Sequence, residues 1–289
     1  MPVSHRGGWG RARYRWSMLE IDVWPRLRDP VLVVAITGWV DAGEAGELTA
    51  STLIDQLEGA RPFGRYPLDD LVDLQQTRPT VELVDGMTRR VTWPQLDLTA
   101  GRAARDVVVI TGPEPSLRWP TFTRDLVEVA TRLGAAQAFT LGGMPAMVSH
   151  HRPVPVLATA TAHSVAQEIG AVRADYEGPT GVQTVLQVAL GEAGIPAVGL
   201  WAQVPHYVSG NPSPPAVRAL LERLREYAGL RVELGDLDDE IVTYTEKVEE
   251  GLAERPDVAD LVDAIEDESV EEVSGDELAA EIEQFLRDQ

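Results

Sequence analysis

The chain has 289 residues, of which 44% are hydrophobic and 25% charged, a composition typical of globular proteins with a large core. It contains no cysteine, which excludes disulfides, thiolate nucleophiles, iron–sulfur clusters and Cys-ligated zinc, and we expect a cytoplasmic protein. The longest apolar run, residues 31–36, is far shorter than the roughly 20 residues of a membrane-spanning helix. No charged-then-apolar leader opens the sequence, so neither secretion nor membrane insertion is expected.

The net charge of −21 is concentrated near the C-terminal end. Residues 231–289 hold 22 of the 46 acidic residues but only 4 of the 25 basic ones, so the rest of the chain is nearly neutral. Nucleic-acid binding requires a basic surface that displaces counterions, and neither part provides one. Nucleic acid is therefore not an expected partner.

Composition divides the chain into four segments. We predict that residues 1–17 are a disordered N-terminal arm or precede the true start at Met18, and that residues 18–230 form an α/β core domain. Residues 231–265 are expected to form an acidic helical subdomain, and residues 266–289 an acidic linker with a terminal helix. The acidic helices are expected at 236–251 and 257–265. A capping box predicts the last helix at 277–287, where Leu278, Ile282, Phe285 and Leu286 form an apolar stripe suited to helix-in-groove contact.

Five short apolar runs bounded by Gly or Pro predict buried strands, at residues 31–37, 106–111, 136–141, 154–160 and 197–204. Because they are apolar on both faces, they favour a mostly parallel sheet covered by helices on each side. Apolar residues at helical spacing predict four helices, at residues 44–57, 122–133, 182–190 and 216–227. Alternating strands and helices predict an α/β fold.

One segment interrupts this alternation. Residues 80–84 and 87–93 flank Asp85-Gly86, a two-residue turn sequence that tolerates positive φ. We predict a β-hairpin inserted between the first helix and the second core strand. It is either a ribbon that contacts another subunit or a plain antiparallel edge.

Ligands of open parallel sheets bind at the carboxyl ends of the strands, so the loops there contain the candidate site residues. The first loop carries Gly38, Trp39, Asp41, Gly43 and Glu44. Its glycine spacing is typical of a phosphate cradle, but two acids without Lys or Arg disfavour a nucleotide. Capping of the following helix by Asp41 and Glu44 is favoured over acid–base catalysis.

The second strand is followed by Gly112 and by Glu114, which stands between two prolines. A fixed acid at this edge is a catalytic candidate, but a solvent-facing turn acid is the favoured interpretation. The third strand ends in Gly142, Gly143 and Met144, whose small residues let the backbone approach a ligand or another chain closely.

His150 and His151 follow, and with the acids of the other loops they form a conceivable acid–base or metal set. Adjacent histidines in a strand point to opposite faces, however, and cannot both bind one ion. We therefore predict no metal site and no cofactor.

Two further loops complete this edge. Tyr176, Gly178 and Thr180 precede the third helix, where Thr180 or the backbone is expected at the N-cap and a polar ligand has room to bind. Trp201 and His206 close the last strand, a place where aromatic residues line a pocket or an interface. No Gly-x-Ser-x-Gly elbow or Ser–His–Asp spacing is present, so nucleophilic hydrolysis has no support and no enzyme class is assigned.

Taken together, the loop sequences resemble the proteasome assembly chaperone 2 family in its bacterial, largely uncharacterised branch; they are GWVDAGEAG (38–46), TGPEP (111–115), LGGMP (141–145), YEGPTG (176–181) and GLWAQVPHYV (199–208). The resemblance covers residues 18–265. It implies a three-layer α/β/α fold similar to nucleoside phosphorylases and hydrolases, a cytoplasmic protein, and homo-oligomers.

Eukaryotic relatives in that family hold proteasome α-subunits during ring assembly, and a tail ending in a hydrophobic residue, a tyrosine and one more residue is associated with proteasome docking. This sequence departs from that pattern, because it ends in Leu286-Arg287-Asp288-Gln289. The resemblance supplies no catalytic residues to transfer.

Two functions from different classes follow. The first is an oligomeric, assembly-chaperone-like protein whose partner is another protein, with a proteasome subunit as a candidate. The alternative is a small-molecule sensor or enzyme at the strand ends, with Asp41, Glu44 and Glu114 acting on an uncharged or cationic ligand.

Overall fold

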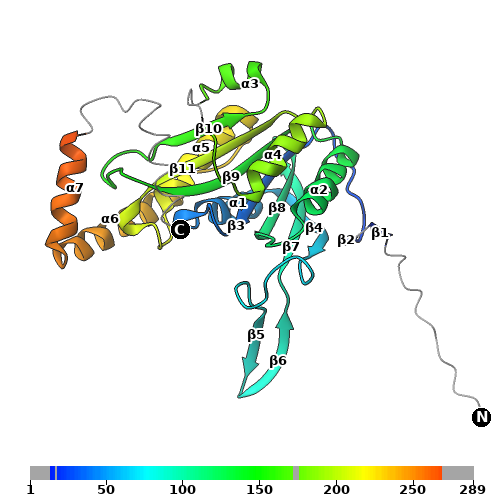
Figure 1. Ribbon diagram of the computed structural model, residues 1–289, viewed down its shortest axis with the longest axis horizontal. Helices are drawn as coiled ribbons and strands as arrows, with labels where there is room; N and C mark the ends of the chain where they lie inside the picture. Colours follow the sequence, from blue (N-terminus) through cyan, green and yellow to red (C-terminus); the bar gives the residue numbers. More distant parts are fainter. Residues whose placement is uncertain (1–13, 17, 172–175, 269–289) are drawn as a thin grey trace, which may run out of the picture.

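A computed structural model describes residues 14–16, 18–171 and 176–268 (Figure 1). Within these residues the frame is a nine-stranded sheet. Its strand order is β1 (Tyr14–Trp16), β2 (Leu19–Ile21), β4 (Glu58–Pro67), β7 (Gln95–Ala103), β8 (Arg105–Pro113), β3 (Val31–Thr37), β9 (Gln137–Ala146), β11 (Ala197–Pro205) and β10 (Val156–Ala160).

The middle of the sheet is parallel. β3 pairs with β8 on one side and β9 on the other, and β9 pairs with β11. Side chains of β3 alternate between two buried faces: Val31, Val33 and Ala35 pack in one core cluster, and Leu32, Val34 and Ile36 pack in the other. A strand buried on both faces is apolar throughout, which is why the continuous apolar runs located these four strands correctly.

Four helices cover the two faces, and they are the four that the sequence predicts. α1 (Ala45–Gln56) and α5 (Pro214–Ala228) contribute to one core cluster. α2 (Trp119–Leu133) and α4 (Val182–Glu192) contribute to the other (Figure 1). The predicted three-layer α/β/α architecture is therefore confirmed.

The outer strands differ from the expectation. β10, expected among the parallel strands, runs antiparallel to β11 at the sheet edge. β4 and β7 were not predicted, and they pair antiparallel between β2 and β8. β4 contains Gly59, Pro62 and Gly64 and has two register shifts, so its sequence is typical of loops, and only pairing with β7 makes it a strand. A short helix, α3 (His163–Glu168), was also not predicted.

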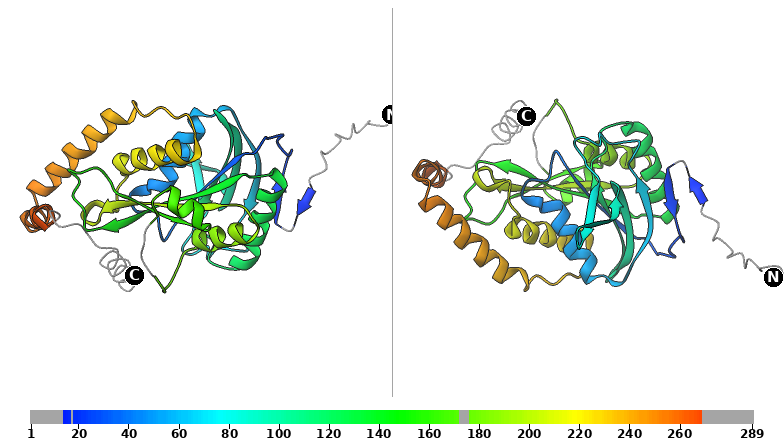
Figure 2. Two further views of the ribbon diagram at one scale, coloured as in Figure 1. Left: turned by 90° about the horizontal axis from the view of Figure 1, so that it is seen from above. Right: turned by 90° about the horizontal axis from the view of Figure 1, so that it is seen from below.

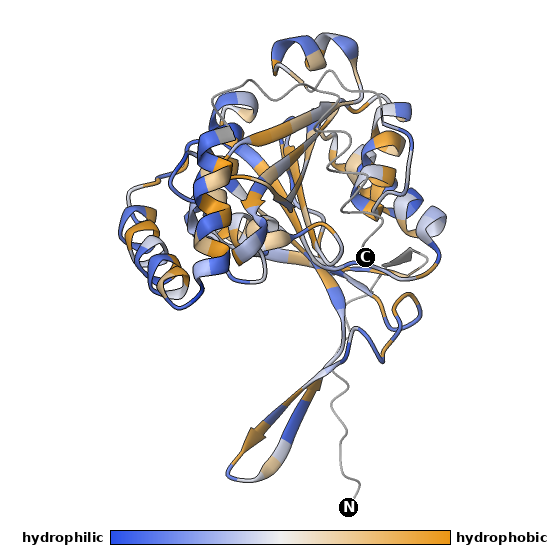
Figure 3. Ribbon diagram, turned by 60° about the vertical axis from the view of Figure 1, so that its left-hand side comes forward, coloured by the Kyte–Doolittle hydropathy of each residue, from blue (hydrophilic) through white to orange (hydrophobic). Residues whose placement is uncertain are grey.

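The predicted hairpin is confirmed as β5 (Thr80–Val84) and β6 (Met87–Thr92). Its turn residues Asp85 and Gly86 have φ of 52° and 75°, the left-handed region that the turn sequence predicts. Every residue of both strands is exposed, and the hairpin extends away from the sandwich (Figures 1 and 3). We call β5 and β6 with Trp93 the arm.

The acidic C-terminal helices are α6 (Leu237–Ala253) and α7 (Pro256–Glu268). Leu234, Leu237 and Ile241 join the core cluster of α5, so the start of α6 is fixed to the sandwich. From there α6 runs along the side of the molecule and α7 lies at its far end (Figure 2). None of the described helices combines the length and the apolar character required to cross a bilayer.

Two segment predictions are corrected where the structure describes them. Residues 14–16, expected in a disordered arm, form β1 against β2, because paired backbone groups compensate for the lack of apolar periodicity. Residues 266–268, expected in a solvated linker, form the last turn of α7, where Glu266 contacts the core domain. The other residues of the predicted N-terminal segment (1–13 and 17) lie outside the described residues. So do residues 269–272 of the predicted linker and the predicted helix at 277–287.

Candidate functional site

The carboxyl ends of the four parallel strands meet at one edge of the sheet, as the sequence predicts. Their loops bond to one another: the Glu114 N–H donates to the Thr37 carbonyl at 2.8 Å, and Gly43 donates to Ser209 at 2.8 Å. Asp41 forms an isolated parallel bridge with Gly143. The loops after β3, β8 and β11 and the end of β9 therefore make one continuous structure.

Glycines allow this close approach. A Cβ added at Gly142 would overlap the Val40 carbonyl oxygen, and one at Gly143 would overlap that of Ala42. A Cβ at Gly112, with φ of 147°, would overlap the Gln95 carbonyl oxygen, and one at Gly38, with φ of 146°, would lie 3.0 Å from the Glu114 Cβ. The small residues thus let backbone approach backbone within this chain, and the space predicted for a ligand is occupied by the neighbouring loop.

Asp41 caps α1, as predicted. Its carboxylate accepts the Gly46 N–H at 2.6 Å and the Glu47 N–H at 3.4 Å. Burial raises the pKa of Asp41 to about 6, although both backbone hydrogen bonds oppose that rise. Glu44 was expected to share the capping, but its side chain is exposed and makes no capping hydrogen bond.

Glu114 was expected to face solvent, and this prediction is wrong. Its side chain is half-buried, and Oε1 accepts the N–H of Val182, the first residue of α4, at 2.8 Å. The N-cap residue of α4 is Gly181, and the acceptor comes from a loop 68 residues earlier instead of from Thr180. Glu114 is thus a capping residue that ties the end of β8 to α4.

This assignment predicts how Glu114 variants behave. Glu114→Ala is expected to lower the free energy of unfolding by about 1 kcal/mol, because it leaves the Val182 N–H without its acceptor. Glu114→Gln retains an amide oxygen and should lose less than half of that. Urea unfolding followed by circular dichroism measures both values. If the two variants were equally destabilised, the amide oxygen of Gln would not replace the carboxylate as acceptor, and the capping assignment would fail.

The remaining space at this edge is small. The cavity beside Glu114 has a volume of about 10 Å³ and is lined mainly by Ile36, Trp39, Val40 and Trp201. Such a volume holds about one water molecule. A small organic ligand does not fit in this cavity, so the cavity gives no support to the enzyme or sensor hypothesis.

The other candidates of this edge serve local structure. Tyr176 donates its hydroxyl proton to the Pro179 carbonyl at 2.8 Å, and its ring closes over Gly178, so their loop folds on itself. Met144 is half-buried in β9. His206 begins η2 (His206–Val208), and its buried Nδ1 has no hydrogen-bond partner among the described residues.

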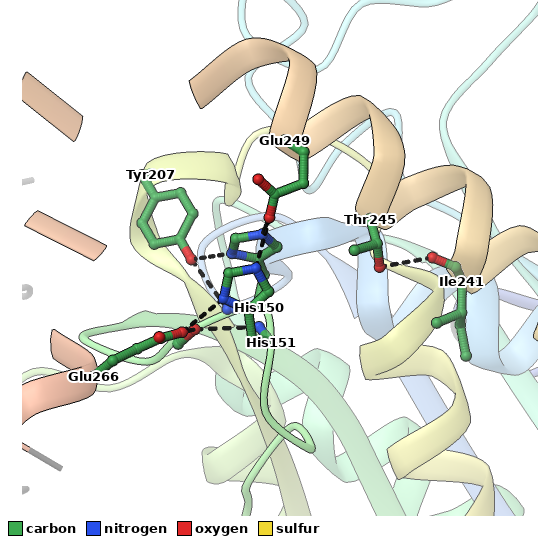
Figure 4. A network of polar contacts seen from close by, with 8 residues as sticks. His150, His151, Tyr207, Ile241, Thr245, Glu249 and Glu266 are labelled. Atoms are coloured by element: carbon green, nitrogen blue, oxygen red, sulfur yellow. Dashed lines mark hydrogen bonds and ion pairs between the residues drawn. The ribbon is translucent and has the colours of Figure 1, made fainter. Parts of the chain in front are cut away.

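His150 and His151 belong to a second group of residues, which the sequence analysis missed (Figure 4). They lie in the turn after β9 and not in a strand, so their ring centroids are 4.0 Å apart and the side chains do not point to opposite faces. Their Nε2 atoms both face Oε1 of Glu249 on α6, at 2.9 and 2.6 Å. The two histidines therefore share one contact, and the expectation that they point to opposite faces is wrong.

The electrostatics of the two imidazoles differ. Burial lowers the pKa of His150, whereas hydrogen bonds to Glu266 and Glu249 raise the pKa of His151. The pKa values of both carboxylates are lowered, that of Glu249 by the histidines and that of Glu266 by Ser149 and then His151. Glu249 is 99 residues from His150 in sequence, so no local pattern could have indicated this cluster.

A wide groove lies next to the cluster. It has a volume of about 710 Å³ and runs between the loop after β11 and the helices α6 and α7, with Tyr207, Pro212, Tyr244 and Leu252 among its lining residues. The strand-end cavity is far smaller, so of these two hollows the larger one faces the acidic helices and not the sheet edge.

The sequence model of the PAC2 family matches residues 35–252, most of the chain. The chain belongs to the PAC2 family. The resemblance of the five strand-end loops to that family is thereby confirmed.

Two solved structures of PAC2-type proteins are 38% identical to this chain. One is a PAC2 family protein from Streptomyces avermitilis, with a TM-score of 0.74 over 81% of this chain and 100% of that one. The other is a proteasome-assembly chaperone homologue of Mycobacterium tuberculosis, with a TM-score of 0.74 over 80% of this chain and 99% of that one. Both are similar in sequence and in fold.

A more distant likeness extends to archaea. An archaeal proteasome activator from Pyrococcus furiosus is 16% identical, with a TM-score of 0.65 over 80% of this chain and 97% of that one. At this identity the likeness shows a common fold alone. No curated protein sequence matches the chain significantly.

Proposed function

We propose that this PAC2 protein is a cytoplasmic homo-oligomer that acts as an assembly chaperone for proteasome subunits. The exposed arm carries the proposal. Two-stranded hairpins without other packing are marginally stable in water, so contact with a partner surface is needed to stabilise an arm of this length.

The arm is apolar as well as exposed. Val81 pairs directly with Val91, and these side chains are 55% and 47% exposed. Leu83 and Met87 are 63% and 50% exposed. Six of the large hydrophobic side chains that the described chain exposes lie on the arm; they are Val81, Leu83, Val84, Met87, Val91 and Trp93. Several exposed apolar side chains gathered on one element are typical of protein-binding sites.

The choice of partner rests on relatives and on charge. A homologue 38% identical to this chain is described as a proteasome-assembly chaperone homologue. The acidic helices α6 and α7 offer negative charge to a basic partner surface, with acids in the first turn of each. No catalytic set among the described residues competes with this interpretation.

The test replaces apolar surface on the arm. Val81→Thr, Leu83→Thr and Val91→Thr together keep β-propensity and the turn but remove three of the six large apolar side chains of the arm. We expect native mass spectrometry to show an oligomer for the original chain and monomers for this variant. Binding to recombinant proteasome α-subunits of the source organism, measured by surface plasmon resonance, should weaken at least tenfold.

The control removes similar surface elsewhere. Val23→Thr, Leu117→Thr and Val242→Thr change side chains that are 62%, 55% and 56% exposed outside the arm, and should leave both measurements unchanged. A monomeric original chain that binds no proteasome subunit would refute the proposal. Unchanged binding and oligomer number in the arm variant would refute the role of the arm.

A further inference from the structure

Three potential metal ligands converge between the turn after β9 and α6. One ring nitrogen of His150, one of His151 and a Glu249 carboxylate oxygen lie within 4.8 Å of one another. Both imidazoles face the same oxygen, Glu249 Oε1 (Figure 4), and the His150 side chain is fully buried. Two neutral imidazoles and one carboxylate form a common donor set for zinc.

The second ring nitrogen of each histidine, Nδ1, also has a hydrogen-bond partner. His150 Nδ1 is 2.8 Å from the Tyr207 hydroxyl, which also accepts the His150 backbone N–H at 3.0 Å. His151 Nδ1 is 2.7 Å from Glu266 Oε1, and this oxygen accepts the Ser149 hydroxyl at 2.5 Å. Partners on the far nitrogen fix the tautomer and the orientation of a metal-binding histidine, and a carboxylate there increases its basicity.

The distances fit a site that opens slightly on binding. Zinc ligands at about 2.1 Å in tetrahedral geometry are separated from each other by about 3.4 Å. The present separations of 2.9 and 2.6 Å from Glu249 Oε1 are hydrogen-bonding distances. The Glu249 side chain is 50% exposed, so it can withdraw by the remaining fraction of an ångström without disturbing a packed core.

We propose that His150, His151 and Glu249 bind one Zn²⁺ ion that fastens the acidic helix α6 to the core domain. Three protein ligands leave the fourth position to water or to a group of a bound partner. The ion would link residues 99 positions apart in sequence and hold one wall of the groove described above, which Tyr207 and Val248 line. This inference does not depend on the proposed chaperone function.

The full chain, freed of metal by a chelator, tests the site. Titration with ZnCl₂ in a calorimeter should give one ion per chain. His151→Gln and Glu249→Gln change exposed side chains, so both variants should fold, and each should weaken Zn²⁺ binding at least tenfold. In ¹H–¹⁵N spectra of the original chain, Zn²⁺ should shift the ring nitrogens of His150 and His151 and leave those of His163 unchanged.

Two matched controls exclude adventitious binding. His163→Gln removes an exposed histidine on α3, and Glu250→Gln removes the acid next to Glu249 on α6; both should retain the original affinity. Circular dichroism confirms that each variant is folded. The proposal is overturned if the original chain binds no Zn²⁺, or if both ligand variants bind it as tightly as the controls do.

Discussion

Gly143→Ala is expected to lower the free energy of unfolding by about 3 kcal/mol or more, or to prevent folding. The added Cβ would overlap the Ala42 carbonyl oxygen and come within 3.1 Å of the Ala45 Cβ. The first of these atoms is backbone in a loop fixed by the bridge between Asp41 and Gly143, so it cannot move aside as a flexible side chain would. Thermal and urea unfolding measure the loss.

Gly251→Ala provides the control. Gly251 lies within α6, has no atom within 4 Å of an added Cβ, and its replacement raises helix propensity by about 1 kcal/mol. We expect this variant to be as stable as the original chain or slightly more stable. If Gly143→Ala proved equally harmless, the contact between the first loop and β9 would not be as close as described, and room for a ligand would have to be reconsidered.

Asp41→Ala is expected to cost about 1 kcal/mol at pH 7 and about 2 kcal/mol at pH 5. The cost at pH 7 arises because the variant loses the acceptor for the Gly46 N–H. The larger cost at pH 5 follows from the pKa of Asp41, which is about 6 in the folded chain, above its ordinary value of 3.8. Since the folded state binds this proton more tightly, protonation stabilises the original chain as the pH falls through 6, and the variant lacks that gain.

Urea unfolding of both chains at pH 5 and pH 7 measures the difference, because groups common to both chains cancel. Glu44→Ala is the matched control: its carboxylate is exposed and makes no capping hydrogen bond, so it should change stability by less than about 0.5 kcal/mol at either pH. A stability difference for Asp41→Ala that shrank on acidification would contradict the raised pKa of Asp41.

The sequence by itself determined the parts of the fold that depend on local pattern. β3, Val31–Thr37, spans the apolar run of residues 31–36 and one more residue, because a strand covered on both faces is apolar nearly throughout. The turn of the arm follows from Asp85-Gly86, whose residue types tolerate positive φ. The family was also identifiable, because its motifs lie in the loops at the ends of these predictable strands.

Tertiary structure alone decided the pairing of the outer strands and the chemistry of the candidate residues. β4 is a strand because β7 supplies hydrogen-bond partners to a segment rich in turn residues. Glu114 caps a helix that begins 68 residues later, and His150 meets an acid 99 residues away. The local sequence around a carboxylate or an imidazole is the same whether the group caps a helix, contacts another side chain or faces solvent. The contact partner decides the role, and only the packing of distant elements brings that partner near.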